Sequence, residues 1–590
     1  MPVDSAMSDP DFSAPAAPAT PSWQRDWLLL ALAFGALYFF RLGSYPLSDP
    51  DEGRNAEIAR EMLVSGDWVT PRLDGVNYFE KPPLVYWLTA VSEKLFGLNE
   101  WAVRAVPALL AIGGVLLTYA AARRLHGRDA GLMSAIVLGT SLLWFAIGHI
   151  PLLDMAVSVF MAGALFAFII GVGEPPGARR RRLFLLLYAS MALATLAKGL
   201  IGFLVTGAVM FLWLLVFNQW KRLRPLHLLP GVLLFLVIAA SWHVLAALRN
   251  PTWVHRYFVY EHFERFLTPA ASRPGPVHYF VWILIAGLIP WTGFLWPAVR
   301  TAVRGGWAKR DDNCVAWYLV TWAAFIFFFF SISKSKLPPY ILPIFPALAV
   351  LIGAWLARVA GETGGAARMR GGLRVFTFIN GLLAVALLAA VLKPGLIIHD
   401  PAQALALQAP AFAMAATLLL GGIFVPWLAK IRGARQAIAG VTVTAVFFLA
   451  GLEFAAPNII KPGTKPLALL VKSLAKPGDR VMHYFDIFQG FCFYAERTVE
   501  CVAGEASVQK LAFSEIEFKE DAAAVARGQL MTEAKFREAW THSTRVFMVA
   551  KKGDVTGPRA DGQPALFADP TFHYHLLAEN RDYYLFSNQP

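Results

Sequence analysis

The first residues that could do chemistry are three acids that follow the first apolar run of the chain. Asp49, Asp51 and Glu52 lie close together inside the segment 48–62. Carboxylates can take up a proton or stabilise positive charge that develops during a reaction. One interpretation is an acidic site that contains Asp51. The other is an amphipathic helix that starts near Asp51 and lies on a membrane surface, because acids in the first turn suit the helix dipole.

A second candidate carboxylate, Asp154, lies in the very short and mostly apolar connection 149–155. A charged side chain beside lipid costs several kcal/mol, so its position there requires an explanation. Asp154 stands at the predicted start of a helix, where it could act only as a cap. If it instead lies near Asp51, the two carboxylates form an acidic site at the outer membrane–water boundary.

Some lysines lie near the bilayer surface on the predicted outer side of the chain, where basic residues are normally scarce. Lys81 precedes two prolines that would start a short helix on the membrane surface, and Lys198 lies between two apolar runs. Lys334 and Lys336 share one short outer connection. An anionic lipid headgroup would explain this set. The alternative is that the lysines only extend to the interface as anchors.

The outer loop 248–277 mixes aromatic side chains with charges of both signs. Arg256 or Arg265 could hold a phosphate through paired hydrogen bonds. His262 together with Glu80 could bind a divalent metal such as zinc or magnesium, although two ligands are fewer than such a site needs. An amphipathic helix at the interface is the alternative interpretation of the whole loop.

Apolar runs long enough to cross a membrane must position these residues. A helix rises about 1.5 Å per residue, so about 20 apolar residues span the hydrocarbon core. The sequence predicts thirteen spans, with a tight turn at Lys198-Gly199 dividing two short ones. The predicted spans are 27–40, 105–121, 130–148, 155–172, 183–197, 199–217, 229–247, 278–299, 315–332, 338–357, 375–392, 410–428 and 437–456.

The charges between these runs predict the orientation of the chain. With the N-terminus in the cytoplasm, each of the six cytoplasmic connections carries three or four lysines and arginines. Basic residues are retained on the cytoplasmic side, and a miscounted span would break the alternation. The loops 44–104 and 248–277 and the segment 459–590 then lie outside. We expect a disordered cytoplasmic tail over 1–26 and a transmembrane catalytic domain over 27–458.

The outer segment 459–590 alternates short strand-like and helical patterns, which predict a small α/β domain. Cys492 and Cys501 both lie in it, and a disulfide between them stays open. The predicted strands cover 480–484, 545–550 and 583–586, and the predicted helices lie near 465–475 and 515–540.

The composition sets the class of protein. Of 590 residues, 57% are hydrophobic and only 16% are charged, with a net charge of +13. Soluble proteins carry about 25% charged residues, so a disordered protein, a disulfide scaffold and a soluble enzyme are excluded. The basic excess belongs to the cytoplasmic connections rather than to a nucleic-acid site. We predict an all-α polytopic membrane protein with a small periplasmic C-terminal α/β domain.

Several of these motifs together resemble the bacterial members of the GT-C superfamily, which are glycosyltransferases that use polyprenyl-phosphate sugars. The nearest resemblance is to the lipid A 4-amino-4-deoxy-L-arabinose transferase family, which is related to the protein O-mannosyltransferases. The resemblance extends over nearly the whole chain, although the first-loop motif does not fix the sugar or the acceptor. It is carried by the segments 49–59 (DPDEGRNAEIA), 66–73 (GDWVTPRL), 78–84 (YFEKPPL), 196–199 (LAKG) and 334–340 (KSKLPPY).

The resemblance implies a GT-C fold of about thirteen transmembrane helices in the bacterial inner membrane, with the C-terminal domain in the periplasm. It implies a sugar donor on undecaprenyl phosphate and a lipid A phosphate as the acceptor. The reaction would be an inverting glycosyl transfer that modifies lipopolysaccharide and gives resistance to cationic peptides such as polymyxin. Its partners would be these two lipids and the bilayer, with no required cofactor.

The resemblance also implies roles for individual residues. Asp51 would be the principal catalytic carboxylate, and Asp154 the second acidic residue. Lys81 and Arg265 would hold the lipid phosphate, with Tyr340 near it. The other candidates for binding the lipid phosphate are Arg54, Lys198 and Lys336.

Other classes of protein stay open. A related transferase that moves a hexose or another sugar to a protein, a glycan or another lipid would share these motifs. A transporter would carry charges near the middle of the membrane in broken helices, whereas the non-cytoplasmic charges here lie mostly at the outer surface. A structural or assembly protein of the membrane would need no acidic site.

Overall fold

The structure is a computed structural model that describes residues 22–223, 225–264, 275–393, 395–503, 529–542, 544–557 and 565–590. The chain divides into two compact units. The break at Ile459 lies next to the predicted start of the C-terminal domain, but the first outer loop groups with that domain rather than with the spans. Unit 1 comprises Met1–Leu42, Pro107–His243 and Glu261–Ile459, and unit 2 comprises Gly43–Val106, Val244–Tyr260 and Ile460–Pro590.

Each predicted apolar run corresponds to a helix or to consecutive helices. Two short 3₁₀ turns, η1 (Trp220–Leu223) and η5 (Gly306–Lys309), lie in connections. The helices that match the runs are α1 (Ser22–Tyr38), α4 (Glu100–His126), α5 (Arg128–Gly139) with α6 (Leu142–Ile147), α7 (Leu153–Gly173), α8 (Ala178–Lys198), α9 (Ile201–Phe217), α10 (Leu228–Phe235) with η2 (Leu236–Ala240) and α11 (Ser241–Arg249), α13 (Tyr279–Gly287) with α14 (Thr292–Ala302), α15 (Cys314–Ile332), η6 (Pro338–Ile344) with α16 (Phe345–Gly361), α17 (Gly365–Leu392), α18 (Pro401–Arg432) and α19 (Ala434–Ile459).

Eight helices of the described chain are long and apolar enough to cross a membrane, or nine if the bent pair α13–α14 counts as one span. That pair is bent by 101°. Helices α1 and α9 are shorter, and α8 has four arginines in its first turns. The predicted fold class, mostly helical with many membrane spans and a small C-terminal sheet domain, is confirmed. The number thirteen stays a prediction.

The predicted division at Lys198-Gly199 is confirmed. Helix α8 ends at Lys198 and α9 begins at Ile201. Between them Gly199 has a φ of 92°, a region that favours glycine, and its N–H donates to the carbonyl oxygen of Thr195. One long span is thereby replaced by two short helices, and the turn places Lys198 at a helix end.

Helix α1 begins earlier than the sequence suggests. Residues 22–26 of the predicted disordered tail are helical, while 1–21 lie outside the described residues. Asp26, in the second turn of α1, pairs with Arg128 at 2.7 Å and accepts a hydrogen bond from the Tyr119 hydroxyl at 2.9 Å. These partners hold the start of α1 against two later helices, which a sequence pattern could not reveal.

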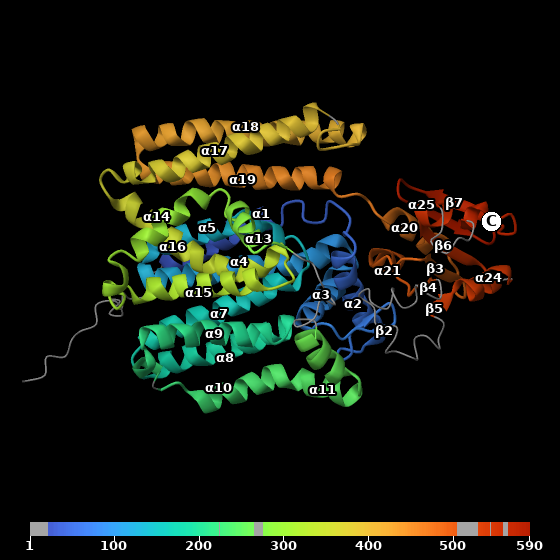
Figure 1. Ribbon diagram of the computed structural model, residues 1–590, viewed down its shortest axis with the longest axis horizontal. Coiled ribbons are helices and arrows are strands. Elements are labelled where there is room, and N and C mark those ends of the chain that lie inside the picture. Colours follow the sequence, from blue (N-terminus) through green and yellow to red (C-terminus); the bar gives the residue numbers. More distant parts are fainter. Residues whose placement is uncertain are drawn as a thin grey trace, which may run out of the picture. The chain divides into compact units, whose positions relative to one another are not determined.

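The helices of unit 1 differ in how much of their apolar surface is buried inside the protein. Helix α7 is apolar along its length, packs against α8 and α9, and has 89% of its apolar window buried. Helices α17, α18 and α19 pack side by side (Figure 1), with only 22% to 44% of their windows buried. Apolar side chains on such exposed faces are stable only where lipid surrounds them.

Unit 2 contains a six-stranded mixed sheet in the order β5-β4-β3-β6-β8-β7. The first four strands of this order are parallel, and β8 runs antiparallel to both β6 and β7. The three strands expected from the sequence are confirmed as β3, β6 and β8. The strands are β3 (Arg480–Tyr484), β4 (Glu500–Ala503), β5 (Leu530–Thr532), β6 (Val546–Lys551), β7 (His575–Glu579) and β8 (Tyr583–Ser587).

Short helices complete this domain. The predicted helix near 465–475 is α20. Part of the predicted helix at 515–540 is α24, but residues 530–532 form strand β5 instead, and 515–528 lies outside the described residues. The helices are α20 (Lys465–Leu474), α21 (Gln489–Ala495), α24 (Glu533–Thr541), α25 (Lys552–Thr556) and the 3₁₀ turn η7 (Leu566–Ala568).

The loop between α1 and α4 is an ordered part of unit 2. It forms α2 (Asp51–Ser65), the hairpin β1 (Arg72–Leu73) and β2 (Val76–Asn77), and α3 (Leu84–Phe96), which follows Pro83 as predicted. Asp74 and Gly75 connect β1 to β2 with φ angles of 54° and 75°. Two positive φ angles in a two-residue loop are the pattern of a type I′ hairpin turn, which favours the Asp-Gly pair.

Packing in unit 2 decides two questions that the sequence left open. Helix α2 is not a surface helix with one apolar face, because nearly every residue from Glu52 to Met62 is buried. It packs against α3 and against α21, which covers the face that an isolated helix would expose. Cys492 and Cys501 are both buried free thiols, so they form no disulfide.

Candidate active site

The three acids of the first loop have different surroundings. Glu52 is held on all sides: its carboxylate pairs with Arg104 through two hydrogen bonds of 2.9 Å and accepts from the backbone N–H and the hydroxyl of Ser48. The Arg104 guanidinium also donates to the carbonyl oxygen of Tyr45 and stacks on its ring at 3.8 Å. Glu52 therefore fixes the start of α2 and has no access to a substrate.

The Asp49 carboxylate also has a hydrogen-bond partner within the chain. Its Oδ1 accepts a hydrogen bond of 2.7 Å from the backbone N–H of Gly490, at the start of α21. This contact joins positions 441 residues apart in the sequence. It ties the segment before α2 to the C-terminal domain.

Asp51 keeps a solvent-exposed carboxylate. It is the first residue of α2, its side chain is 43% exposed, and one oxygen accepts a hydrogen bond of 2.6 Å from Arg54. The carboxylates of Asp49 and Glu52 hold the fold, whereas the carboxylate of Asp51 is accessible to a substrate. Among the three acids, the geometry therefore favours Asp51 for chemistry and places Arg54 beside it.

Helix α2 and its neighbours also carry a group of buried acids that the sequence did not single out. Glu57 pairs with Arg60 at 2.6 Å, and Glu61 accepts the N–H of Gly75. Burial raises the pKa of the Glu57 carboxyl and, more strongly, that of Glu61. The only available signal was the i, i+4 spacing of these two acids on one helix, with Arg60 between them in the sequence.

Asp74 and Glu93 complete this group. Asp74 accepts the N–H of Val499 at 2.6 Å, and burial raises the pKa of Asp74 to about 8. Glu93, on α3, is 2% exposed, and neither of its carboxylate oxygens has a hydrogen-bond partner among the described residues. Burial raises the pKa of Glu93 well above its usual value, and the nearby charge of Glu57 adds to this effect. At neutral pH, a pKa of about 8 favours the protonated form of Asp74.

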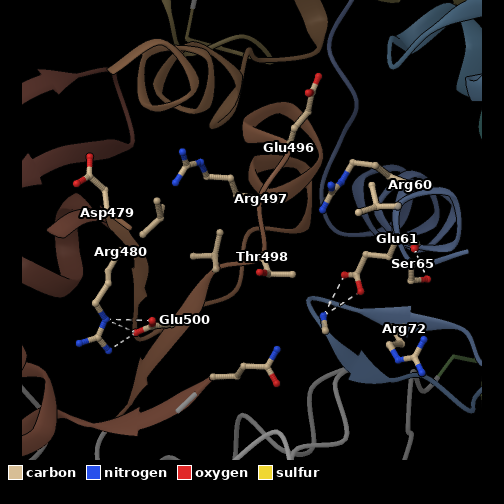
Figure 2. Close-up of a pocket in the computed structure, with 15 residues that line it drawn as sticks. Arg60, Glu61, Ser65, Arg72, Asp479, Arg480, Glu496, Arg497, Thr498 and Glu500 are labelled. Atoms are coloured by element: carbon tan, nitrogen blue, oxygen red, sulfur yellow. Dashed lines mark hydrogen bonds and ion pairs between the residues drawn. The ribbon is translucent and has the colours of Figure 1, made fainter. Parts of the chain in front are cut away.

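A polar cavity of about 720 Å³ opens beside the second half of α2. Figure 2 shows Arg60 and Glu61 of α2 on one wall, and Arg480, Arg497 and Glu500 of the C-terminal domain on the other. Its guanidinium groups already have partners within the chain. Arg60 binds Glu57, Arg480 binds Glu500, and Arg497 donates to a backbone carbonyl oxygen. Neither Asp51 nor Arg54 lines this cavity, so it is separate from the exposed carboxylate.

Unit 1 brings three of the predicted site residues together. Asp154 lies in the first turn of α7, and Lys198 ends α8. The Lys198 ammonium donates to Asp154 Oδ1 and lies 5.0 Å from the centre of the Tyr340 ring, in η6. The side chains of Lys198 and Asp154 are only 18% and 11% exposed. Asp154 is thus more than a helix cap, because its carboxylate holds Lys198 in an ion pair.

Lys336 has a different environment. Its ammonium donates to the backbone carbonyl oxygens of Ser331 and Ser333, and the residue is buried. Ser331 belongs to the last turn of α15, where free carbonyl groups attract a cation. The geometry makes Lys336 a helix cap, and its predicted binding of a lipid phosphate stays a prediction.

One buried pair in unit 1 was missed at the sequence level. His149 Nε2 lies 3.8 Å from Glu453 Oε1, and the imidazole stacks on Tyr38 at 5.4 Å between ring centres. His149 is the first residue of the short connection that carries Asp154. The two residues are more than 300 positions apart in the sequence, so only the packing of α19 could reveal the pair.

The remaining predicted residues are placed only in part. The Lys81 ammonium donates to the carbonyl oxygen of Glu80 at 3.0 Å. Arg265 and the side chain of His262 lie outside the described residues. No group of three metal-ligating side chains occurs among those that the structure describes. Asp51 belongs to unit 2 and Asp154 to unit 1, so their pairing across one site stays a prediction.

Comparisons with known proteins identify the family. The family model described as dolichyl-phosphate-mannose-protein mannosyltransferase matches residues 80–244. A protein of Erwinia tasmaniensis named undecaprenyl phosphate-alpha-4-amino-4-deoxy-L-arabinose arabinosyl transferase is 34% identical, over 64% of this chain and 67% of its own length. This chain belongs to that arabinosyl transferase family. The family member of the same name from Edwardsiella ictaluri is also 34% identical, over 62% of this chain and 65% of its own length.

The alignment with the Edwardsiella relative spans slightly less than two thirds of its length, but the fold agrees over almost the whole chain. The crystal structure of ArnT from Cupriavidus metallidurans bound to undecaprenyl phosphate matches with a TM-score of 0.82 at 28% identity. The match covers 97% of this chain and 98% of that chain. Both the membrane helices and the small C-terminal sheet domain are therefore family features.

Proposed function

We propose that this protein transfers 4-amino-4-deoxy-L-arabinose from undecaprenyl phosphate to a lipid A phosphate at the periplasmic face of the bacterial inner membrane. The observation that carries the proposal is the likeness, over 97% of the chain, to a structure that holds undecaprenyl phosphate. The names of relatives at 34% identity support the choice of sugar. The charge bias of the connections supports a cytoplasmic N-terminus and an outer C-terminal domain.

The proposed reaction is a direct displacement at the anomeric carbon. The bond from that carbon to the undecaprenyl phosphate oxygen breaks, and its electron pair leaves with the phosphate. An oxygen of the lipid A phosphate forms the new bond on the opposite face, which inverts the anomeric centre. The acceptor oxygen is already anionic, so no base has to remove a proton. Carboxylates such as Asp51 then serve to stabilise positive charge on the sugar.

The basic residues serve the leaving group in this proposal. Negative charge increases on the leaving phosphate, and fixed cations lower the barrier where water is partly excluded. Lys198 has few accessible conformations because Asp154 and the Tyr340 ring hold its ammonium on two sides. We propose that Lys198, Lys81 and Arg265 hold this phosphate.

A lipid A assay tests the proposal. The protein would be expressed in cells that lack their own transferase but make the donor, and lipid A would be analysed by mass spectrometry. We expect a species that carries one amino-pentose on phosphate. Asp51→Asn should abolish it. Asp582→Asn is the matched control, because Asp582 is 46% exposed and also pairs with a basic residue. An unchanged lipid A profile with the unaltered protein would overturn the proposal.

The alternative that remains is transfer of another sugar to another acceptor. It shares the donor chemistry, so a purified-protein assay with undecaprenyl-phosphate hexose and undecaprenyl-phosphate aminoarabinose distinguishes the two. Turnover with the aminoarabinose donor alone supports the first proposal, and turnover with the hexose donor alone supports the alternative.

A further inference from the structure

We propose that helix α21 of the C-terminal domain positions Asp51, and that Gly490 and Asp49 are the residues that transmit this positioning. The inference rests on the proposed catalytic role of Asp51. It gives the C-terminal domain a part in the reaction, although none of its residues needs to touch a substrate.

The first observation is the hydrogen bond between the two segments. The Gly490 N–H donates to Asp49 Oδ1 at 2.7 Å. Asp49 stands two residues before Asp51, so this bond fixes the chain immediately ahead of the exposed carboxylate. On the other side of Asp51, Glu52 is held by Arg104 at 2.9 Å. The backbone of Asp51 is thus fixed from both sides while its side chain stays exposed.

The second observation is the close approach of two glycines. A Cβ atom on Gly53 would lie 2.5 Å from the nitrogen and 2.8 Å from the Cα of Gly490. A Cβ atom on Gly490 would lie 2.9 Å and 3.1 Å from the two carboxylate oxygens of Asp49. Contacts below 3.0 Å force a shift, so the first turns of α2 and α21 come this close because Gly53 lacks a side chain, and the absence of one at Gly490 leaves room for the Asp49 carboxylate.

The third observation is a second attachment from the same helix. The Tyr494 hydroxyl accepts the Leu47 N–H at 2.8 Å and donates to Glu100 at 2.8 Å. Leu47 and Ala56, which flank the Asp51 motif, share one apolar core with Phe491 and Phe493 of α21. Helix α21 therefore contacts the chain before Asp49, at Asp49 and after Asp51. A helix that served only to cover its own sheet would not need these attachments.

The expected effect follows from the sensitivity of catalysis to geometry. A displacement of a reacting group by about 1 Å costs about 100-fold in rate. Gly490→Ala should push the Asp49 carboxylate away and move the chain that leads to Asp51. We expect kcat to fall by about 10- to 100-fold while the KM for the donor changes little. A plain loss of folding would instead lower the amount of folded protein and leave the kcat of the remainder unchanged.

The test uses the full-length purified protein and the lipid A transfer assay. Gly490→Ala and Asp49→Ala should both lower kcat, whereas Asp49→Asn should stay near the unaltered protein because its amide oxygen still accepts the Gly490 N–H. The added methyl group of Gly490→Ala meets the Asp49 carboxylate. The double variant with Asp49→Ala should therefore lose less than the product of the two single losses. Gly553→Ala is the control, because a Cβ there meets nothing within 4 Å.

A further variant separates positioning from general damage. If Gly490→Ala acts through Asp51, it should not lower the residual rate of Asp51→Asn any further. An additional tenfold loss in that background would overturn the inference, and so would full activity of Gly490→Ala in a protein where Asp51→Asn is inactive. Normal activity of Asp51→Asn itself would instead remove the catalytic role of Asp51 from the proposed function, which is a distinct result.

Discussion

The two units hold their charged candidate residues in different ways. In unit 1, Lys198 and Asp154 stand at the ends of helices that pack against each other, 44 positions apart in sequence. In unit 2, the segment around Asp51 is held by Gly490 and Tyr494, more than 400 positions away. The helix end in unit 1 depends on neighbouring helices, whereas the loop between α1 and α4 depends on the C-terminal domain of the same unit. A motif in such a loop cannot be interpreted without that domain.

Burial also differs between the two regions. The Glu52–Arg104 pair is almost fully buried, whereas the Lys198–Asp154 pair keeps some solvent access. Removing one partner of a buried pair leaves an uncompensated charge, which costs more than losing a partly exposed pair. We therefore expect loss of the Glu52–Arg104 pair to act mainly on stability, and loss of the Lys198–Asp154 pair to act mainly on activity.

The largest expected effect is that of Arg104→Ala. It leaves the buried Glu52 carboxylate without its partner and should lower the free energy of unfolding by about 3–5 kcal/mol. Thermal unfolding of the detergent-purified protein would measure this. Arg249→Ala is the control, because this exposed arginine pairs with Asp67 at 3.2 Å and should change stability by at most about 1 kcal/mol. Equal losses from the two variants would contradict the contrast in burial.

Lys198→Met should affect activity more than stability. Loss of a cation near the proposed leaving phosphate should reduce kcat/KM by about 100-fold, which corresponds to about 2.7 kcal/mol of transition-state stabilisation. The melting temperature should change much less than in Arg104→Ala. Arg368→Met removes an exposed cation paired with Glu362 and should leave transfer unchanged. If Lys198→Met kept its kcat/KM but melted at as low a temperature as Arg104→Ala, the pair in unit 1 would serve stability rather than activity.

Tyr494→Phe tests the attachment of α21 to Leu47, in the segment that leads to α2. The Leu47 N–H loses its acceptor in a buried environment, which should cost about 1–3 kcal/mol of stability. Tyr38→Phe in unit 1 removes a hydroxyl that donates to the Gly139 carbonyl oxygen at 3.1 Å. It should cost only about 1 kcal/mol. If chemical denaturation gave the larger loss for Tyr38→Phe, unit 2 would not depend on α21 as described.

The smallest expected effect is a pH dependence confined to unit 2. Burial raises the pKa of Asp74 to about 8 and raises that of Glu93, so above the unfolded value near 4 the folded state holds more protons than the unfolded state. Their contribution to stability is then complete below about pH 4 and is lost as pH rises towards 8.

Glu93→Gln should flatten this dependence. The melting temperature of the unaltered protein should fall between pH 5 and pH 8, and the fall should be smaller in the variant. Glu538→Gln removes the same charge from an exposed position and should leave the slope unchanged. A parallel slope in all three proteins would show that Glu93 ionises equally well in the folded and unfolded states.

Much of the fold followed from local patterns. Apolar runs and basic connections located the helices, because length and charge act within each segment. The turn at Lys198-Gly199 and the strands β3, β6 and β8 were also predicted from patterns within single segments. The interpretation of α2 as a surface helix failed, because its covering helix, α21, lies more than 400 residues further along the chain.

The candidate site divides in the same way. The sequence by itself determined that Asp51 and Asp154 are charges in places where lipid or an apolar turn makes charge costly, so both stood out. Only the tertiary structure decided that Asp49 and Glu52 hold the loop while Asp51 stays exposed, and that Lys198 meets Asp154 and Tyr340. Hydrogen bonds and ion pairs form between atoms that packing brings within about 3 Å, and residue order alone does not specify that distance.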